Sequence, residues 1–207
     1  MNDRMSEGFT LVEMVVVVAI IALMSGLILT RIPSLRSQTA VNTSVGTLLQ
    51  TARDARLKSS TVEQLETTGD FPAYGVYFDL STPQQIVVYA DCTIDDNADG
   101  ILNQLDKFYY QPSECSGSSI KKTALLQAFT KISAIRTVST SGSISDTKAY
   151  MEYVRPDPTI WLSDVNAVNA TNPNVLPYGH IEIDVSDMNG KFTKTIEFWT
   201  SGKVAVR

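Results

Sequence analysis

The chain has 207 residues, of which 43% are hydrophobic and 19% charged, and it carries a formal net charge of −5. This length predicts one globular domain with a smaller appendage and excludes two sizeable cores. The acidic balance argues against a broad surface for nucleic acid. The chain has one histidine and two cysteines, whereas most zinc sites and Ser-His or Cys-His catalytic arrangements need more of these side chains. The composition therefore argues against an enzyme.

The first predicted element is an apolar helix over residues 9–29. Residues 14–29 are apolar apart from Ser25 and Gly26, and the whole block reaches the roughly 20 residues that cross a hydrocarbon core. No small-residue cleavage site follows the block, as an ordinary secretory signal would require. We therefore expect a segment that spans a membrane and is not removed after its apolar core.

Glu13 interrupts this apolar block. A charged side chain at the centre of a membrane helix costs roughly 2.5 to 3.5 kcal/mol on insertion scales. Two explanations are open: Glu13 lies near the membrane interface, where the cost is small, or its carboxylate meets a positive partner inside an assembly.

Residues 7–18 read EGFTLVEMVVVV, and this run resembles the class III signal of type IV prepilins and pseudopilins. The resemblance implies that a prepilin peptidase cuts between Gly8 and Phe9 and that the new amino group of Phe9 is methylated. It also implies that Glu13 pairs with the N-terminal amine of a neighbouring subunit. A buried carboxylate and a buried amine are each costly alone and tolerable together, so such a pair would favour one axial stagger between packed helices.

A second helical segment is predicted after Pro33, which can kink or end a helix. Apolar side chains recur there at spacings of 4, 3, 4 and 3, which places them on one helical stripe: Val41, Val45, Leu48, Ala52 and Ala55. We expect one helix of about 50 residues, bent near Pro33, with a membrane half and a half that packs on a soluble head.

Short apolar runs separated by turn residues predict antiparallel strands in the rest of the chain. The expected strands are residues 73–79, 85–90, 107–110, 132–138, 159–162, 180–185, 194–199 and 203–206. Turns are expected at Asn189-Gly190 and Ser201-Gly202. Residues 139–147 and 164–177 lack periodicity and predict loops.

Pattern and resemblance together predict an α+β, pilin-like fold with a long N-terminal helix packed on an antiparallel β-sheet head. The expected parts are a leader (1–8), a transmembrane or filament-core helix (9–30), its amphipathic continuation (31–60) and a β-rich head (61–207). Residues 52–55 with Val62, and the C-terminal run TIEFWTSGKVAV, are similar to the H-type pseudopilin and FimT-like minor pilin group. Domains of that group end in a strand, a glycine turn and a short final strand.

An Asp-rich segment predicts a calcium loop in the head. It fits the pattern D-x-[DN]-x-[DN]-G, with Gly100 at the sharp turn. The expected ligands are Asp95, Asn97, Asp99, the Ile101 carbonyl, Asn103 and Asp106. Asp106 stands where a longer glutamate usually closes the shell, which should weaken calcium binding. The alternative is a surface turn rich in Asp and Asn.

Cys92 and Cys115 bracket this loop. In an oxidising compartment we expect a disulfide between them, which would contribute roughly 3 kcal/mol in the chain-entropy model. The alternative is a pair of buried thiols.

Two further features concern polar side chains near the C-terminus. His180 is expected to be a surface or edge residue rather than a metal ligand. A small basic face is expected from Lys191, Lys194, Lys203 and Arg207, by default a solvated one.

The resemblance implies a non-enzymatic subunit of a type IV pilus or a type II secretion pseudopilus. Its partners would be other pilin or pseudopilin subunits, the prepilin peptidase and the cytoplasmic membrane, with the head outside the cytoplasm and later in a filament. One alternative is a FimT-like pilin that captures DNA, against which the net charge argues. Another is a membrane-anchored hydrolase, which only the acidic residues support.

Overall fold

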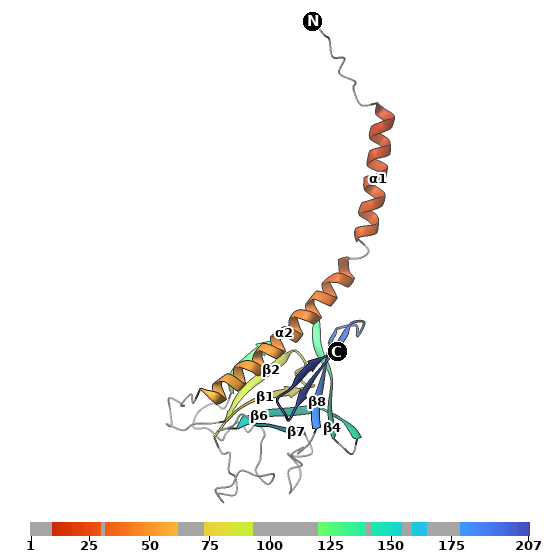
Figure 1. Cartoon of the computed structure of the whole chain (residues 1–207). Coiled ribbons are helices and arrows are strands. Elements are labelled where there is room, and N and C mark those ends of the chain that lie inside the picture. The colour runs from red at the N-terminus through yellow and green to blue at the C-terminus, as the bar shows by residue number, and fades with distance from the viewer. Residues whose placement is uncertain are drawn as a thin grey trace, which may run out of the picture.

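The computed structural model describes residues 10–29, 32–61, 73–92, 120–139, 142–154, 159–164 and 179–207. Two helices, α1 (Leu11–Leu29) and α2 (Ile32–Ser60), precede the strands. The strands are β1 (Ala73–Asp79), β2 (Gln85–Asp91), β3 (Ile120–Leu125), β4 (Thr130–Ser139), β5 (Gly142–Asp146), β6 (Lys148–Val154), β7 (Thr159–Asp164), β8 (Gly179–Asp187), β9 (Thr193–Trp199) and β10 (Val204–Val206). This architecture is the predicted α+β fold, with a long N-terminal helical region and a β-rich head (Figure 1).

In its described residues the head contains two antiparallel sheets. Their strand orders are β3-β2-β1-β6-β7 and β10-β9-β8-β4-β5. Phe78 of β1 and Phe198 of β9 stack with ring centroids 6.3 Å apart, so the sheets share one core. Figure 1 shows α2 lying along these sheets, while α1 extends away from the head.

The predicted apolar stripe of α2 is the face that packs on the head. All five of its residues are buried, with Leu48 and Ala55 fully so. Buried hydroxyls add specific contacts: Ser44 Oγ lies 2.7 Å from Thr130 Oγ1 and accepts a hydrogen bond from the backbone N–H of Gln127. A buried polar group needs a hydrogen-bond partner. These contacts supply partners for Ser44, and they join α2 to the segment that leads into β4.

The described parts of the helical region meet close to Pro33, and residues 30 and 31 between them lie outside the described residues. α1 ends at Leu29, and Pro33 is the second residue of α2. Proline is tolerated in the first turn of a helix because the N–H that it lacks would have no partner within the helix there. Figure 1 shows α1 and α2 running in different directions, and Pro33 stands in the first turn of α2 rather than in the middle of a helix.

Most predicted strands are present, but three strands were missed. The expected strand at 107–110 lies outside the described residues, and the other expected strands match β1, β2, β4, β7, β8, β9 and β10. The missed strands are β3, β5 and β6. In β6, Ala149, Met151 and Tyr153 belong to the main hydrophobic core, while Tyr150 and Glu152 between them are buried as well, so burial along this strand does not alternate.

The prediction of a loop over residues 139–147 is wrong, because β5 occupies residues 142–146. Four of the five residues of this edge strand are exposed, so it has little apolar periodicity. Its pairing with β4, from Ile135↔Asp146 to Ser139↔Gly142, makes it a strand. The expected loop at 164–177 begins at Asp164, the last residue of β7, and the rest of it lies outside the described residues.

Both predicted glycine turns are confirmed. Gly190 has φ 69° in the connection between β8 and β9, and Gly202 has φ 83° between β9 and β10. Glycine adopts positive φ without the steric cost that a Cβ imposes. The backbone N–H of Gly202 donates to the Trp199 carbonyl at 2.9 Å, which closes the second turn.

Candidate functional site: the exposed N-terminal helix

α1 is apolar on all sides and leaves its side chains exposed. Leu11 is 81% exposed, Leu23 72% and Leu27 73%. The helical region beginning at Leu11 is the one stretch of the described chain that is long and apolar enough to cross a membrane. A helix that is hydrophobic all round needs an apolar environment on every face. α1 therefore fits a single-pass membrane anchor.

The first turn of α1 has a specific N-terminal cap. The backbone N–H of Glu13 donates to Thr10 Oγ1 at 3.3 Å, which satisfies one of the free donors at the helix start. Thr10 and Glu13 have the T-x-x-E spacing of a capping box, a signal that the sequence analysis missed. Glu13 thus lies at the positive end of the helix dipole, where a carboxylate is favoured.

The carboxylate of Glu13 belongs to an exposed residue. Among the described residues no cationic group lies within ion-pair distance of it. Gly8 and Phe9, the expected processing residues, lie outside the described residues, so cleavage, methylation and charge pairing stay predictions.

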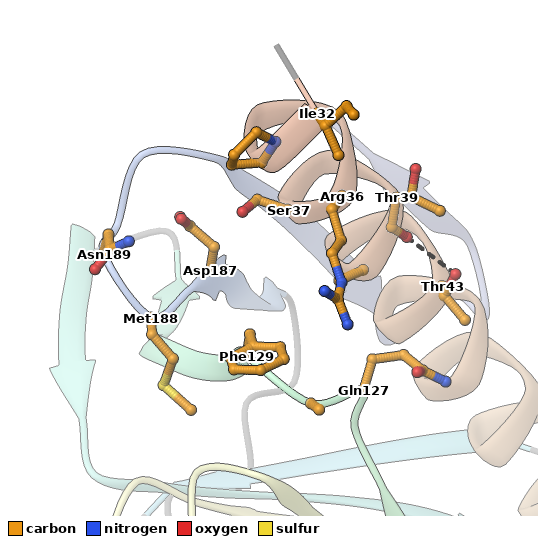
Figure 2. Close-up of a pocket in the computed structure, with 13 residues that line it drawn as sticks. Ile32, Arg36, Ser37, Thr39, Thr43, Gln127, Phe129, Asp187, Met188 and Asn189 are labelled. Carbon is orange, nitrogen blue, oxygen red and sulfur yellow. Dashed lines mark hydrogen bonds between the residues drawn. The ribbon is translucent and has the colours of Figure 1, made fainter. Parts of the chain in front are cut away.

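A cavity of about 750 Å³ lies where the start of α2 meets the head. Arg36 of α2 reaches toward Phe129 from one side, and Met188 borders the hollow from the β8–β9 connection (Figure 2). The Arg36 guanidinium carbon is 5.7 Å from the centroid of the Phe129 ring, a cation–π distance. Phe129 has φ 70°, and its side chain is 61% exposed. The end of the head nearest α1 thus presents apolar surface next to a basic side chain.

The predicted calcium and disulfide residues are described only in part. Cys92 follows β2 and is partly buried. Cys115 and the expected calcium ligands from Asp95 to Asp106 lie outside the described residues. Both sites therefore stay predictions.

The four basic residues near the C-terminus do not form one face. Lys194 pairs in register with the buried Val185 and lines a cavity with Val41 of α2, so it lies on the side of the sheet that faces the helix. Arg207 binds Glu197 on the opposite side, and Lys203 Nζ lies 5.4 Å from the Trp199 ring. Successive residues of a strand point to opposite faces. Basic residues that are close together in the sequence therefore lie on different faces of the sheet.

The expectation that His180 is a surface or edge residue is wrong. Its strand β8 lies in the middle of its sheet, between β9 and β4, and its side chain is only 12% exposed. The imidazole stacks on Trp199 with centroids 4.1 Å apart. The sequence places a polar residue at the start of an alternating strand, but which strands flank it depends on the sheet order.

A comparison with family models finds one match: the prokaryotic N-terminal methylation motif matches residues 3–29. No curated protein and no solved structure matches the chain. The matched segment contains Gly8, Phe9 and Glu13 together with all of α1. The N-terminus therefore carries a prepilin-type methylation motif, which supports a type IV pilin- or pseudopilin-like role for the chain.

Proposed function

We propose that the chain is a minor pilin or pseudopilin, a non-enzymatic subunit of a type IV pilus or a type II secretion pseudopilus. One observation carries the proposal: a helix with the prepilin-type motif exposes apolar side chains on every face, while the head has its own core. Lipid would surround α1 before assembly, and the helices of other subunits would surround it afterwards. The head would lie outside the cytoplasmic membrane.

In this proposal the prepilin peptidase removes residues 1–8 and Phe9 is methylated. Glu13 then pairs with the N-terminal amine of a neighbouring subunit. The exposure of Glu13 in the first turn of α1 supports this role, because the carboxylate is open to a group from outside the chain. In a helix bundle of low dielectric, the attraction between these charges would be strengthened.

The finer assignment to the H-type pseudopilin and FimT-like group is also part of the proposal. Its support is the end of the head, where β9, the turn at Gly202 and the short strand β10 follow one another. Capture of DNA is the weaker alternative, because Lys194 and Arg207 lie on opposite faces of their sheet. A hydrolase has no support beyond the acidic residues.

Mass spectrometry of the mature N-terminus in a host with a prepilin peptidase tests the proposal. We expect a product that begins at methylated Phe9. Gly8→Val should leave the leader uncleaved, because the peptidase would no longer find glycine before the cut. Gly26→Val is the matched control, since a Cβ built at Gly26 meets nothing within 4 Å beyond its chain neighbours and the backbone of its own helix. An intact Met1, or a cut beyond Leu29, in the unaltered chain would refute the proposal.

A further inference from the structure

A polar cluster lies on the outer face of the sheet that contains β8 and β9. Ile181, Ile183 and Ile196 point into the core. His180 and Glu182 of β8 and Glu197 of β9 are the immediate chain neighbours of these isoleucines, so they lie on the opposite face of the sheet. The strand register pairs Glu182 directly with Glu197.

The three side chains are close enough to share one ion. One potential ligand atom from each lies within 4.8 Å of the others. The distance from His180 Nε2 to Glu182 Oε1 is 3.4 Å. Two ligands of a tetrahedral zinc ion, each roughly 2.1 Å from the metal, lie about 3.4 Å apart. This pair therefore already has the spacing of two such ligands.

Neighbouring side chains hold these ligands in place. Trp199 stacks on the imidazole of His180. Arg136 Nε donates to Glu182 Oε2 at 2.8 Å, which leaves Oε1 to face His180. Such outer contacts orient ligands and typically change metal affinity 10- to 100-fold.

The buried carboxylate of Glu197 is a separate observation that points to a bound cation. The residue is 1% exposed, and its Oε1 accepts no hydrogen bond from the part of the chain that the structure describes. Arg207 Nε lies 2.8 Å from that oxygen, but its N–H is not aligned to donate to it. A buried carboxylate oxygen without a directed donor is costly. A cation held between Glu197, Glu182 and His180 would satisfy it.

The charges of the cluster also leave room for a divalent cation. Glu182, Asp184 and Glu197 carry three negative charges, and Arg136 and Arg207 carry two positive ones. The Arg207 side chain is 73% exposed, so it can move into solvent at little cost. Without Arg207 the remaining groups carry −2, which one divalent ion neutralises.

We propose that His180, Glu182 and Glu197 bind a divalent transition-metal cation of the zinc class, which displaces Arg207. Zinc binds both histidine nitrogen and carboxylate oxygen, whereas calcium takes oxygen ligands alone. The site is therefore distinct from the calcium loop predicted between Cys92 and Cys115. Three protein ligands leave a fourth tetrahedral position open.

The single histidine of the chain makes a direct test available. The full chain, labelled with ¹⁵N-histidine and kept in detergent micelles with saturating calcium, is titrated with zinc chloride. We expect the one set of imidazole signals to shift to a bound position. Glu197→Gln should weaken zinc binding at least about tenfold, and Arg207→Ala should tighten it, because the competing cation is gone. Asp54→Asn, a like change on α2, is the control and should bind as the unaltered chain does.

The titration of the unaltered chain needs no substitution, so it decides the question even where a variant fails to fold. Imidazole signals that do not respond to zinc would overturn the proposal. Binding by Glu197→Gln that equals that of the unaltered chain would also overturn it. Arg207→Ala binding no tighter than the unaltered chain would refute the displacement of Arg207.

Discussion

The two N-terminal helices follow one another in the chain but differ in the side chains that they expose and bury. α1 exposes apolar side chains on every face, as Val15 at 59% and Ile21 at 58% exposure show. α2 exposes polar faces and buries one narrow stripe around the fully covered Leu48. The difference indicates that α1 depends on lipid or other subunits, whereas α2 belongs to the fold of the head. Assembly and folding should therefore be separable by substitution.

The contrast arises from side-chain size and polarity as well as from hydropathy. α2 approaches the sheets through small residues such as Ala52 and Ala55, and its hydroxyls bond to the head, as when Ser59 Oγ donates to the Tyr153 carbonyl at 2.5 Å. α1 has bulky aliphatic side chains and no such stripe. A helix covered evenly with aliphatic side chains has no single face to dock, so its surroundings decide its orientation.

The first prediction concerns assembly: if Glu13 pairs with a neighbouring subunit's N-terminal amine as proposed, Glu13→Leu should reduce incorporation into filaments at least tenfold, because that buried amine would lose its partner. Immunoblots of sheared filaments and membranes measure the ratio. The thermal unfolding of the head should not change, since Glu13 lies outside it. Equal incorporation of Glu13→Leu and the unaltered chain would contradict the charge pair.

A double substitution tests whether the position of the carboxylate in α1 matters, or only its presence. Glu13→Met combined with Met14→Glu keeps the composition and moves the carboxylate by about 100° around the helix. It should fail as Glu13→Leu does. Thr10→Val removes the observed cap, in which Glu13 uses only its backbone N–H. If Thr10→Val alone reproduced the defect, helix capping would replace charge pairing as the explanation.

The second prediction tests the other half of the comparison. Leu48→Ala should lower the free energy of unfolding of the head by about 2 to 5 kcal/mol, because it opens a cavity under a fully buried side chain. Denaturant unfolding of the full chain in detergent, followed by tryptophan fluorescence, measures it. Leu23→Ala is the matched control in α1 and should leave this transition in place. An equal loss in both variants would mean that the helices form one folding unit.

Calcium should act on the head alone. If the predicted loop binds it, saturating calcium raises the free energy of unfolding of the head by about 1 to 3 kcal/mol through mass action. Asp99→Asn should remove this effect, and Asp54→Asn should not. A melting temperature that is indifferent to both chelator and added calcium would refute the loop hypothesis.

The smallest effect is expected from pH at Asp79, which ends β1. Burial alone would raise its pKa, but hydrogen bonds from Tyr77 and Ser81 and the charge of Lys148 outweigh it, so the pKa lies below its ordinary 3.8. The stabilisation is therefore complete above that value and is lost as pH falls through the lower folded pKa. Between about pH 6 and about pH 3, the free energy of unfolding should fall by roughly 1 kcal/mol more in the unaltered chain than in Asp79→Asn. Denaturant unfolding at each pH measures it. Equal slopes would show that Asp79 is not tuned by these contacts.

The sequence predicted those features that depend on neighbours along the chain. The period of the α2 stripe, the positions of β1 and β8 and the turn at Gly202 follow from local spacing and backbone preference, and the structure confirms them. The apolar length of α1 and the motif around Glu13 could also be predicted from the sequence, because a membrane anchor is defined by consecutive residues. The cap at Thr10 also follows from local spacing, because Thr10 and Glu13 have the spacing of a capping box.

Only the tertiary structure decided what depends on strand order and register. The exposed polar edge strand β5 exists because β4 pairs with it. Lys194 and Arg207 lie on opposite faces because strands alternate and β10 folds back beside β9. The same register brings His180 and Glu182 beside Glu197. Hydrophobic spacing specifies which face of each strand is buried, but contacts between distant residues arise only when the two sheets and α2 close around a common core.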